Sequence, residues 1–269
     1  MKKFVVATIL SFLTFSGSIA FAQPETLKGT WISAEQDLIE ILYTGRDSNF
    51  NYLSNKLLNE DRFHLFIFSD TLSFQHIYTS SFTQFKTEYT DRYDLKVVSV
   101  NDSILVVRPV SDFSKTYFQN RSVITLKKKK YISDKTIVFE KLIYHSKMSG
   151  PTAALQIDSS KNLYMNYVNT CWGGKNGLAS GNYSAVLDDD TYKELIHQLQ
   201  TCNLRTLRFG DIKGADSPVI TLIVYFNGRR KYLKSIAPPR ISDELVTFII
   251  WRLRSYEKLK PTLDKKQIE

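Results

Sequence analysis

Hydrophobic and polar residues alternate in short runs from residue 27 to about residue 136. In residues 93–97 and 123–126, bulky or β-branched residues alternate with polar ones, which is typical of half-buried strands. Residues 65–68 and 72–74 flank a Ser-Asp-Thr cluster, and this arrangement indicates a hairpin because these residues favour turns. The pattern predicts an antiparallel β sheet, curved or barrel-like.

One segment of this half departs from the alternation. Between residues 49 and 59, four apolar residues recur at helical spacing: Phe50, Leu53, Leu57 and Leu58. We expect a short helix inserted among the strands.

From residue 137 the pattern changes to strands that alternate with helices. Residues 154–157 and 163–167 flank a polar turn and predict one hairpin. Asn227-Gly228 lies between two strand-like runs and predicts another, because both central residues of such a turn take positive φ.

A helix is expected after each of these hairpins. Residues 188–200 carry an apolar stripe behind Asp188, which is a candidate N-cap, and residues 242–256 do so behind Ser242. The order ββα-ββα predicts an α+β domain with its helices on one face of an antiparallel sheet.

The first 22 residues have the three parts of a secretory signal peptide. Lys2 and Lys3 precede an apolar run over residues 4–15, and Ala20-Phe21-Ala22 forms a small-x-small cleavage site. We expect an exported protein, periplasmic or secreted, with no membrane span after cleavage, because no later apolar run approaches 18 residues.

These patterns divide the chain into four parts. They are the signal peptide (1–22), an antiparallel β domain (23–136), an α+β domain (137–258) and a polar tail (259–269). No Pro-, Gly- or Ser-rich spacer separates the two domains.

The chain is basic, with a formal charge of +9 over 269 residues. A positive surface attracts anionic glycans, lipid headgroups or acidic proteins, and export makes nucleic acid a poor candidate. The basic residues are dispersed apart from two runs, Lys127-Lys128-Lys129-Lys130 and Arg229-Arg230-Lys231. We interpret both runs as solvated strand ends beside hairpin turns.

Local motifs for catalysis or metal binding do not emerge from the sequence. The four histidines (His64, His76, His145 and His197) form no pair at the spacing of metal ligands, and no Gly-x-Ser-x-Gly motif occurs. We therefore assign no catalytic residue, cofactor or metal ligand.

Two candidate features lie late in the chain. Cys171 and Cys202 are the only cysteines, and export permits a disulfide between them; two separate buried thiols are the alternative. Trp172 lies in a glycine-rich loop beside Cys171, and an exposed tryptophan on a loop often marks a binding contact. Trp172 is the candidate partner contact.

Residues 139–258 resemble a bacterial secreted domain family of unknown function. The resemblance rests on Phe139-Glu140-Lys141-Leu142, on Ile157-Asp158 with Lys161-Asn162-Leu163-Tyr164, and on Gly181-Asn182-Tyr183. The loop at residues 146–151 keeps Gly-Pro but lacks both cysteines of the family's Cys-x-Gly-x-Cys-Pro pattern. Residues 27–31 are similar to the Gly-x-Trp start of lipocalin-like secreted domains. Neither resemblance implies a known activity.

Three classes of function stay open. We favour a non-catalytic extracytoplasmic interaction or structural protein, whose partner could be a protein, a glycan or a small apolar ligand. A lipocalin-like carrier is the first alternative, and it requires a barrel with a cavity larger than side chains fill. A hydrolase without an identifiable motif is the second.

Overall fold

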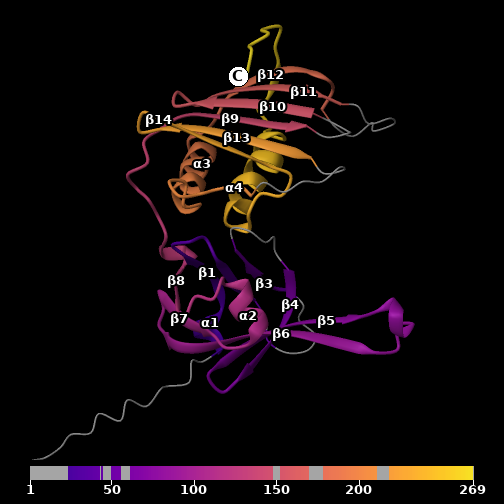
Figure 1. The fold of residues 1–269 in the computed structure, drawn as a ribbon. Coiled ribbons are helices and arrows are strands. Elements are labelled where there is room, and N and C mark those ends of the chain that lie inside the picture. The colour runs from indigo at the N-terminus through magenta and orange to yellow at the C-terminus, as the bar shows by residue number, and fades with distance from the viewer. Residues whose placement is uncertain are drawn as a thin grey trace, which may run out of the picture.

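A computed structural model of the chain describes residues 24–42, 44, 50–55, 61–147, 152–169, 178–210 and 218–268. The protein is mostly β (Figure 1). The first half forms a closed antiparallel barrel, and the second half forms an antiparallel sheet with two helices that lie between the sheet and the barrel. The expected signal peptide lies outside the described residues.

Strands β1 to β8 form the barrel, in which each strand pairs with the next and β8 pairs with β1. This arrangement confirms the barrel-like antiparallel sheet predicted from the alternating pattern. Their bounds are Gly29–Ser33 (β1), Leu38–Ile41 (β2), Asn51–Ser54 (β3), Asp61–Phe68 (β4), Thr71–Thr79 (β5), Glu88–Val100 (β6), Ile104–Pro109 (β7) and Ile124–Lys128 (β8).

Alternate residues of these strands point inward and fill the barrel. Trp31, Phe63 and Phe74 are each 0% exposed, and the Trp31 indole donates a hydrogen bond to the Leu27 carbonyl at 2.7 Å. Aliphatic residues from the other strands complete the cluster: Ile39, Ile41, Leu53, Leu65, Leu72, Leu95, Leu105, Val107, Ile124 and Leu126. The interior is a packed core.

The prediction of a helix between residues 49 and 59 is wrong in the part of that segment that the structure describes. Asn51–Ser54 is strand β3, paired with β2 and β4 on either side. Long-range pairing with two neighbours outweighs a helical spacing of four apolar residues. Residues 56–60 lie outside the described part of the chain.

Four short helical segments accompany the barrel. Helix α2 begins after Ser111, whose hydroxyl accepts a hydrogen bond from the Ser114 N–H. The segments are α1 (Pro24–Leu27), η1 (Ser81–Thr83), α2 (Asp112–Tyr117) and η2 (Lys129–Tyr131).

The second half forms a seven-stranded sheet with the order β14-β13-β9-β10-β11-β12-β15. Four strands, β9 to β12, precede the first helix of this half, two more than the order ββα-ββα predicts, so that order is wrong here. The bounds are Phe139–Lys147 (β9), Thr152–Asp158 (β10), Asn162–Val168 (β11), Gly181–Val186 (β12), Val219–Phe226 (β13), Arg229–Ser235 (β14) and Lys260–Pro261 (β15). Strand β15 lies within the segment expected as a polar tail.

The turn between β13 and β14 confirms the predicted hairpin. Asn227 and Gly228 both take positive φ, at 51° and 67°. The Asn227 side chain also donates to the Thr136 carbonyl at 2.9 Å and accepts from the Val138 N–H at 3.2 Å.

Helix α3 (Asp189–Thr201) matches the predicted first helix, and its N-cap is Asp188 as expected. The second helical stretch differs from the prediction. It consists of η3 (Arg240–Ser242), α4 (Asp243–Thr247) and the π-helical η4 (Phe248–Leu253). Ser242 occupies the N-cap position of α4 as expected, but its side chain makes no capping hydrogen bond, because the chain already winds from Arg240 and the Ser242 hydroxyl donates to the Pro239 carbonyl at 2.7 Å.

Both helices bury their apolar stripe against the seven-stranded sheet. Leu195 and Leu199 of α3, and Phe248 and Leu253 of η4, are at most 5% exposed, as predicted. Ile32 and Leu38 of the barrel belong to the same buried cluster, so the barrel packs directly on this layer. Among the described helices, none is both long and apolar enough to cross a membrane.

Candidate functional site

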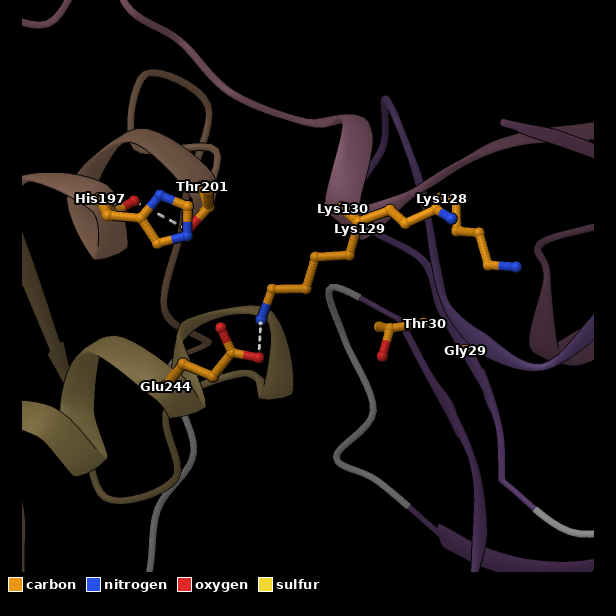
Figure 2. Close-up of a pocket in the computed structure, with 8 residues that line it drawn as sticks. All are labelled: Gly29, Thr30, Lys128, Lys129, Lys130, His197, Thr201 and Glu244. Atoms are coloured by element: carbon orange, nitrogen blue, oxygen red, sulfur yellow. Dashed lines mark hydrogen bonds and ion pairs between the residues drawn. The ribbon is translucent and has the colours of Figure 1, made fainter. Parts of the chain in front are cut away.

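A pocket of about 420 Å³ lies where the barrel meets the helical layer (Figure 2). We call it the junction pocket. Its lining comes from the start of β1, the end of β8 with η2, helix α3 and helix α4: Gly29, Thr30, Lys128, Lys129, Lys130, His197, Thr201 and Glu244. The pocket therefore needs both halves of the chain.

The three lysines reach the pocket because a strand ends there. Strand β8 ends at Lys128, and the 3-10 turn η2 begins at the next residue. The change from extended to helical backbone sends consecutive side chains in different directions, as Figure 2 shows for Lys128 and Lys129. A run of four lysines thus delivers three side chains to one pocket.

The side chain of Lys128 passes over strand β1 at Gly29. Gly29 has φ +116°, and a Cβ there would lie 3.0 Å from the Lys128 Cε. The Lys128 amine donates to the Thr26 carbonyl at 3.1 Å and lies 4.7 Å from the centre of the Trp31 ring. Burial lowers the pKa of Lys128, and the positive charge of Lys130 lowers it further.

Lys129 spans the junction as an ion pair. Its amine lies 2.7 Å from the Glu244 Oε1, and its side chain is only 15% exposed. Glu244 lies in the first turn of α4, where a carboxylate also complements the helix dipole. The charge of Lys129 is therefore already paired, and the ion pair joins the barrel to α4.

Within the described part of the chain, the positive charges of Lys128 and Lys130 are not cancelled by an ion pair, although the carboxylate of Asp102 attracts Lys128 at longer range. Among the described residues, neither amine forms an ion pair with a carboxylate. The Lys130 amine instead lies 4.8 Å from the centre of the Tyr131 ring. With Glu244 cancelling one of the three lysines, the lining carries a formal charge of +2 when His197 is neutral.

Helix α3 contributes neutral polar groups to the opposite wall. His197 and Thr201 are four residues apart, so they share one face of the helix. The Thr201 hydroxyl donates to the His197 carbonyl at 2.9 Å, and the His197 ring is exposed. The Thr201 hydroxyl has no second hydrogen to donate, so the imidazole of His197 is the group on this wall that can donate a hydrogen bond to an oxyanion.

An ion pair beside the pocket holds the two walls in place. The Arg240 Nε donates to the Glu40 Oε2 at 2.8 Å, and the Nη2 lies 2.6 Å from the same oxygen. The guanidinium carbon lies 3.5 Å from the centre of the Tyr52 ring. Glu40 also accepts from the hydroxyl of Thr30, a residue of the pocket lining, at 2.9 Å. We call these residues the junction clamp: Glu40, Tyr52 and Arg240.

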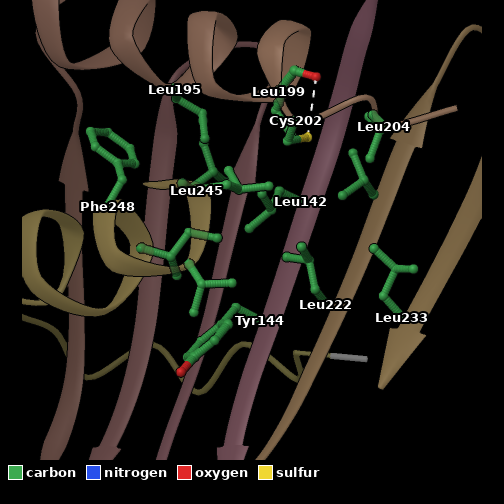
Figure 3. Packing of buried hydrophobic residues seen from close by; sticks show 14 of the residues in the cluster. Leu142, Tyr144, Leu195, Leu199, Cys202, Leu204, Leu222, Leu233, Leu245 and Phe248 are labelled. Atoms are coloured by element: carbon green, nitrogen blue, oxygen red, sulfur yellow. Dashed lines mark hydrogen bonds between the residues drawn. The ribbon is translucent and has the colours of Figure 1, made fainter. Parts of the chain in front are cut away.

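Cys202, one of the candidate residues from the sequence, lies in the core at the end of α3 (Figure 3). Its side chain is 2% exposed, and its thiol donates to the Leu199 carbonyl at 3.5 Å. Burial raises its pKa to about 12, so it stays a protonated thiol at neutral pH. Cys171 and Trp172 lie outside the described residues, so the disulfide and the tryptophan contact stay predictions.

The histidines give no metal site in the described part of the chain, where no group of three His, Cys, Asp or Glu side chains converges. The lysine run lies at a strand end, as expected, with Lys127 and Lys130 exposed, but three of its members also line the junction pocket. The run itself was the visible signal. The other lining residues His197 and Glu244 lie about 70 and 115 residues further along the chain, and no sequence motif around them indicates that they belong to the same site.

Comparisons with family models, with curated proteins and with solved structures give no match to this chain. The two family resemblances therefore stay predictions, and the geometry of the site has to carry the functional argument.

Proposed function

We propose that this chain is an exported, non-catalytic interaction protein that binds an acidic ligand in the junction pocket. The observation that carries the proposal is the pair Lys128 and Lys130, which both line one pocket and form no ion pair among the described residues, with only the longer-range attraction of Asp102 acting on Lys128. An anion placed between them relieves their mutual repulsion and gains charge-assisted hydrogen bonds.

The pocket suits a carboxylate or phosphate group on a small molecule or on the end of a chain. Its volume of about 420 Å³ lies within the range of small-molecule sites. The His197 side chain can add a hydrogen bond to the charged group, whereas the hydroxyls of Thr30 and Thr201 already donate to Glu40 and to the His197 carbonyl. Acidic glycans fit this chemistry and the expected export of the chain.

The finer assignment of the fold belongs to the same proposal. We infer a lipocalin-like domain over residues 23–136 and an α+β domain over residues 137–258. Support comes from the strand pairing, since β1 to β8 pair among themselves and β9 to β15 form a separate sheet.

The carrier alternative receives less support from the packing. Trp31, Phe63 and Phe74 are 0% exposed inside the barrel, so large side chains occupy the space that a carried ligand needs. A second cavity, of about 110 Å³, lies under η4 and is lined by Tyr144, Ile249 and other apolar residues. That volume is below the range for a drug-sized ligand.

The hydrolase alternative also receives less support. The two groups with the largest shifts in pKa are Asp188 and Cys202. Asp188 is shifted downward because it caps α3, and Cys202 is shifted upward because it is buried. Both shifts have structural causes.

Calorimetric titration with three anions tests the proposal: citrate, inorganic pyrophosphate and a short galacturonate oligomer. We expect at least one to bind, and we expect Lys128→Gln and Lys130→Gln each to weaken it about tenfold, as for loss of one charged hydrogen bond. Lys127→Gln is the matched control, because Lys127 belongs to the same run but does not line the pocket. Binding should weaken with added salt.

Two outcomes contradict the proposal. One is the failure of all three anions to bind. The other is an equal loss of affinity in Lys127→Gln and Lys130→Gln, which would indicate a diffuse attraction to the basic surface.

A further inference from the structure

The hairpin formed by β5 and β6 extends beyond the barrel wall (Figure 1). Pairing between β4 and β5 ends at Gln75, and pairing between β6 and β7 involves only residues from Leu95 onward. From His76 to Thr79, β5 pairs with residues 88–91 of β6 in a two-stranded ribbon. At the usual rise per residue this ribbon is roughly 14 Å long.

Two phenylalanines occupy the end of this ribbon. We call residues 80–87 the hairpin tip. Within it Phe82 is 98% exposed and Phe85 is 67% exposed. One exposed apolar residue is ordinary on a protein surface. Two phenylalanines on a projecting tip form an exposed apolar patch that a binding partner or a membrane can contact.

The backbone of the tip is held in one shape. The Ser80 hydroxyl accepts from the Phe82 N–H at 3.2 Å, and the Ser80 carbonyl accepts from the Phe85 N–H at 3.0 Å. The Lys86 N–H donates to the Thr83 carbonyl at 3.0 Å. Gln84 and Phe85 both take positive φ, at 51° and 59°, which is unfavourable for a bulky side chain. The loop thus keeps Phe85 at the tip against its own backbone preference.

A ladder of aromatic rings joins the tip to the barrel core. Tyr78 and Tyr89 stack with ring centres 5.6 Å apart, and His76 stacks on Tyr78 at 5.5 Å. The His76 ring in turn meets the edge of the buried Phe63 at 6.4 Å. The ladder stiffens the ribbon and places tyrosines directly behind the phenylalanines.

Aromatic side chains occupy two levels of the hairpin. Phe82 and Phe85 form the end and Tyr78 and Tyr89 follow, while charged side chains lie both beside the end (Lys86 and Glu88) and nearer the barrel (Asp91 and Arg92). Phenylalanine prefers the apolar side of a membrane interface, and tyrosine prefers the headgroup level. Within the tip the exposed Lys86 is offset by the exposed Glu88 beside it, so the attraction to an anionic surface comes from the basic chain as a whole, whose formal charge is +9, or +7 without Lys2 and Lys3 of the expected signal peptide.

We propose that the hairpin tip inserts Phe82 and Phe85 into the interfacial layer of an anionic lipid membrane. A convex tip enters a lipid surface without a matching pocket, and the tip is already rigid, so little conformational entropy is lost on insertion. This surface is distinct from the junction pocket, so a test of one proposal does not decide the other.

Co-sedimentation with vesicles tests the insertion. The vesicles contain equal parts of phosphatidylglycerol and phosphatidylcholine, and we expect the protein to bind them. Phe82→Ser and Phe85→Ser should each lower the partition coefficient about tenfold, and the double variant about a hundredfold. Leu263→Ser is the matched control, because Leu263 is also 98% exposed but lies near the C-terminus; its effect should stay below about twofold.

A tryptophan probe measures depth. In Phe82→Trp, lipids brominated along their acyl chains should quench the new fluorescence beyond the quenching seen in the unsubstituted protein. Lys86→Gln should weaken binding to anionic vesicles and leave binding to pure phosphatidylcholine unchanged.

Three outcomes would overturn the proposal. The first is no binding to the anionic vesicles. The second is binding that the Phe82→Ser, Phe85→Ser double variant retains, which would indicate electrostatic attraction alone. The third is self-association of the protein that this double variant abolishes, which would identify the occupant of the tip as a second copy of the chain.

Discussion

Asp188 illustrates how much one side chain can organise at the residue scale. Its carboxylate accepts from the Thr191 N–H at 2.8 Å and from the Tyr256 hydroxyl at 2.9 Å, and it lies 3.4 Å from the Lys258 amine. These contacts join the start of α3 to the segment after η4. They hold the pKa of Asp188 well below its ordinary value of 3.8.

This pKa gives a prediction for acid stability. A carboxylate whose pKa is depressed on folding stabilises the fold at pH values above 3.8, and this contribution is lost as the pH falls toward the folded-state pKa. Asp188→Asn should therefore lower the melting temperature at neutral pH, and its difference from the unsubstituted protein should shrink below pH 3.8. Asp190→Asn is the control, because its side chain is 97% exposed. A difference that stays constant with pH would contradict the argument.

A second prediction at this scale concerns the core. Leu195 is 0% exposed and lies in the cluster between α3 and the sheet. Leu195→Ala should lower the free energy of unfolding by about 2–5 kcal/mol, because it leaves a cavity. Leu263→Ala, at a site 98% exposed, should change it by less than about 0.5 kcal/mol. Equal denaturation midpoints for the two variants would show that the burial is wrong.

At the scale of elements, the sequence predicts those whose pattern is local. The alternating runs become barrel strands, Asn227-Gly228 becomes a tight turn, and Asp188 caps a helix. The expected helix at residues 49–59 fails at Asn51–Ser54, because pairing with two distant strands decides that segment. Ser242 lies at the N-cap position of α4, but it makes no capping hydrogen bond because winding begins two residues earlier.

The β13–β14 turn allows an element-scale test. Gly228 has φ +67°, and a Cβ there would meet nothing within 4 Å. Gly228→Ala should therefore destabilise the protein by backbone strain alone, about 1–2 kcal/mol. Gly181→Ala is the control, because its Cβ would meet Tyr183 at an ordinary 3.7 Å and the backbone has no positive φ. Chemical denaturation of both variants measures the difference, and an equal cost at the two sites would contradict the strain argument.

At the scale of the whole molecule, the candidate sites arise from the way distant segments meet. The junction pocket combines the lysine run with α3 and α4, and the hairpin tip gains its exposure from the end of pairing with β4 and β7. Composition and spacing cannot show either arrangement, because the pocket depends on the packing of the barrel against the helical layer and the tip depends on where pairing with β4 and β7 ends. The lysines and phenylalanines were visible in the sequence, but their neighbours were not.

The junction clamp provides the last prediction, because it joins the two halves through partly buried charges. The side chains of Arg240 and Glu40 are 21% and 16% exposed, so removing one leaves the other poorly solvated. Arg240→Met should lower the free energy of unfolding by about 3 kcal/mol, whereas Lys28→Met, which breaks an exposed ion pair with Glu25, should cost below about 1 kcal/mol.

The same variant tests whether the halves unfold together. Ile32 and Leu38 of the barrel lie in the core of the helical layer, so calorimetry of the unsubstituted protein should show one transition. Loss of the Arg240 contacts weakens this junction, and Arg240→Met should broaden or split the transition. The double variant Glu40→Gln, Arg240→Met should recover part of the lost stability, because it removes the poorly solvated charge of Glu40, while Asp243, the other partner of Arg240 at 3.6 Å, is 45% exposed. A single sharp transition in Arg240→Met, with stability unchanged, would show that the apolar contact alone joins the barrel to the sheet.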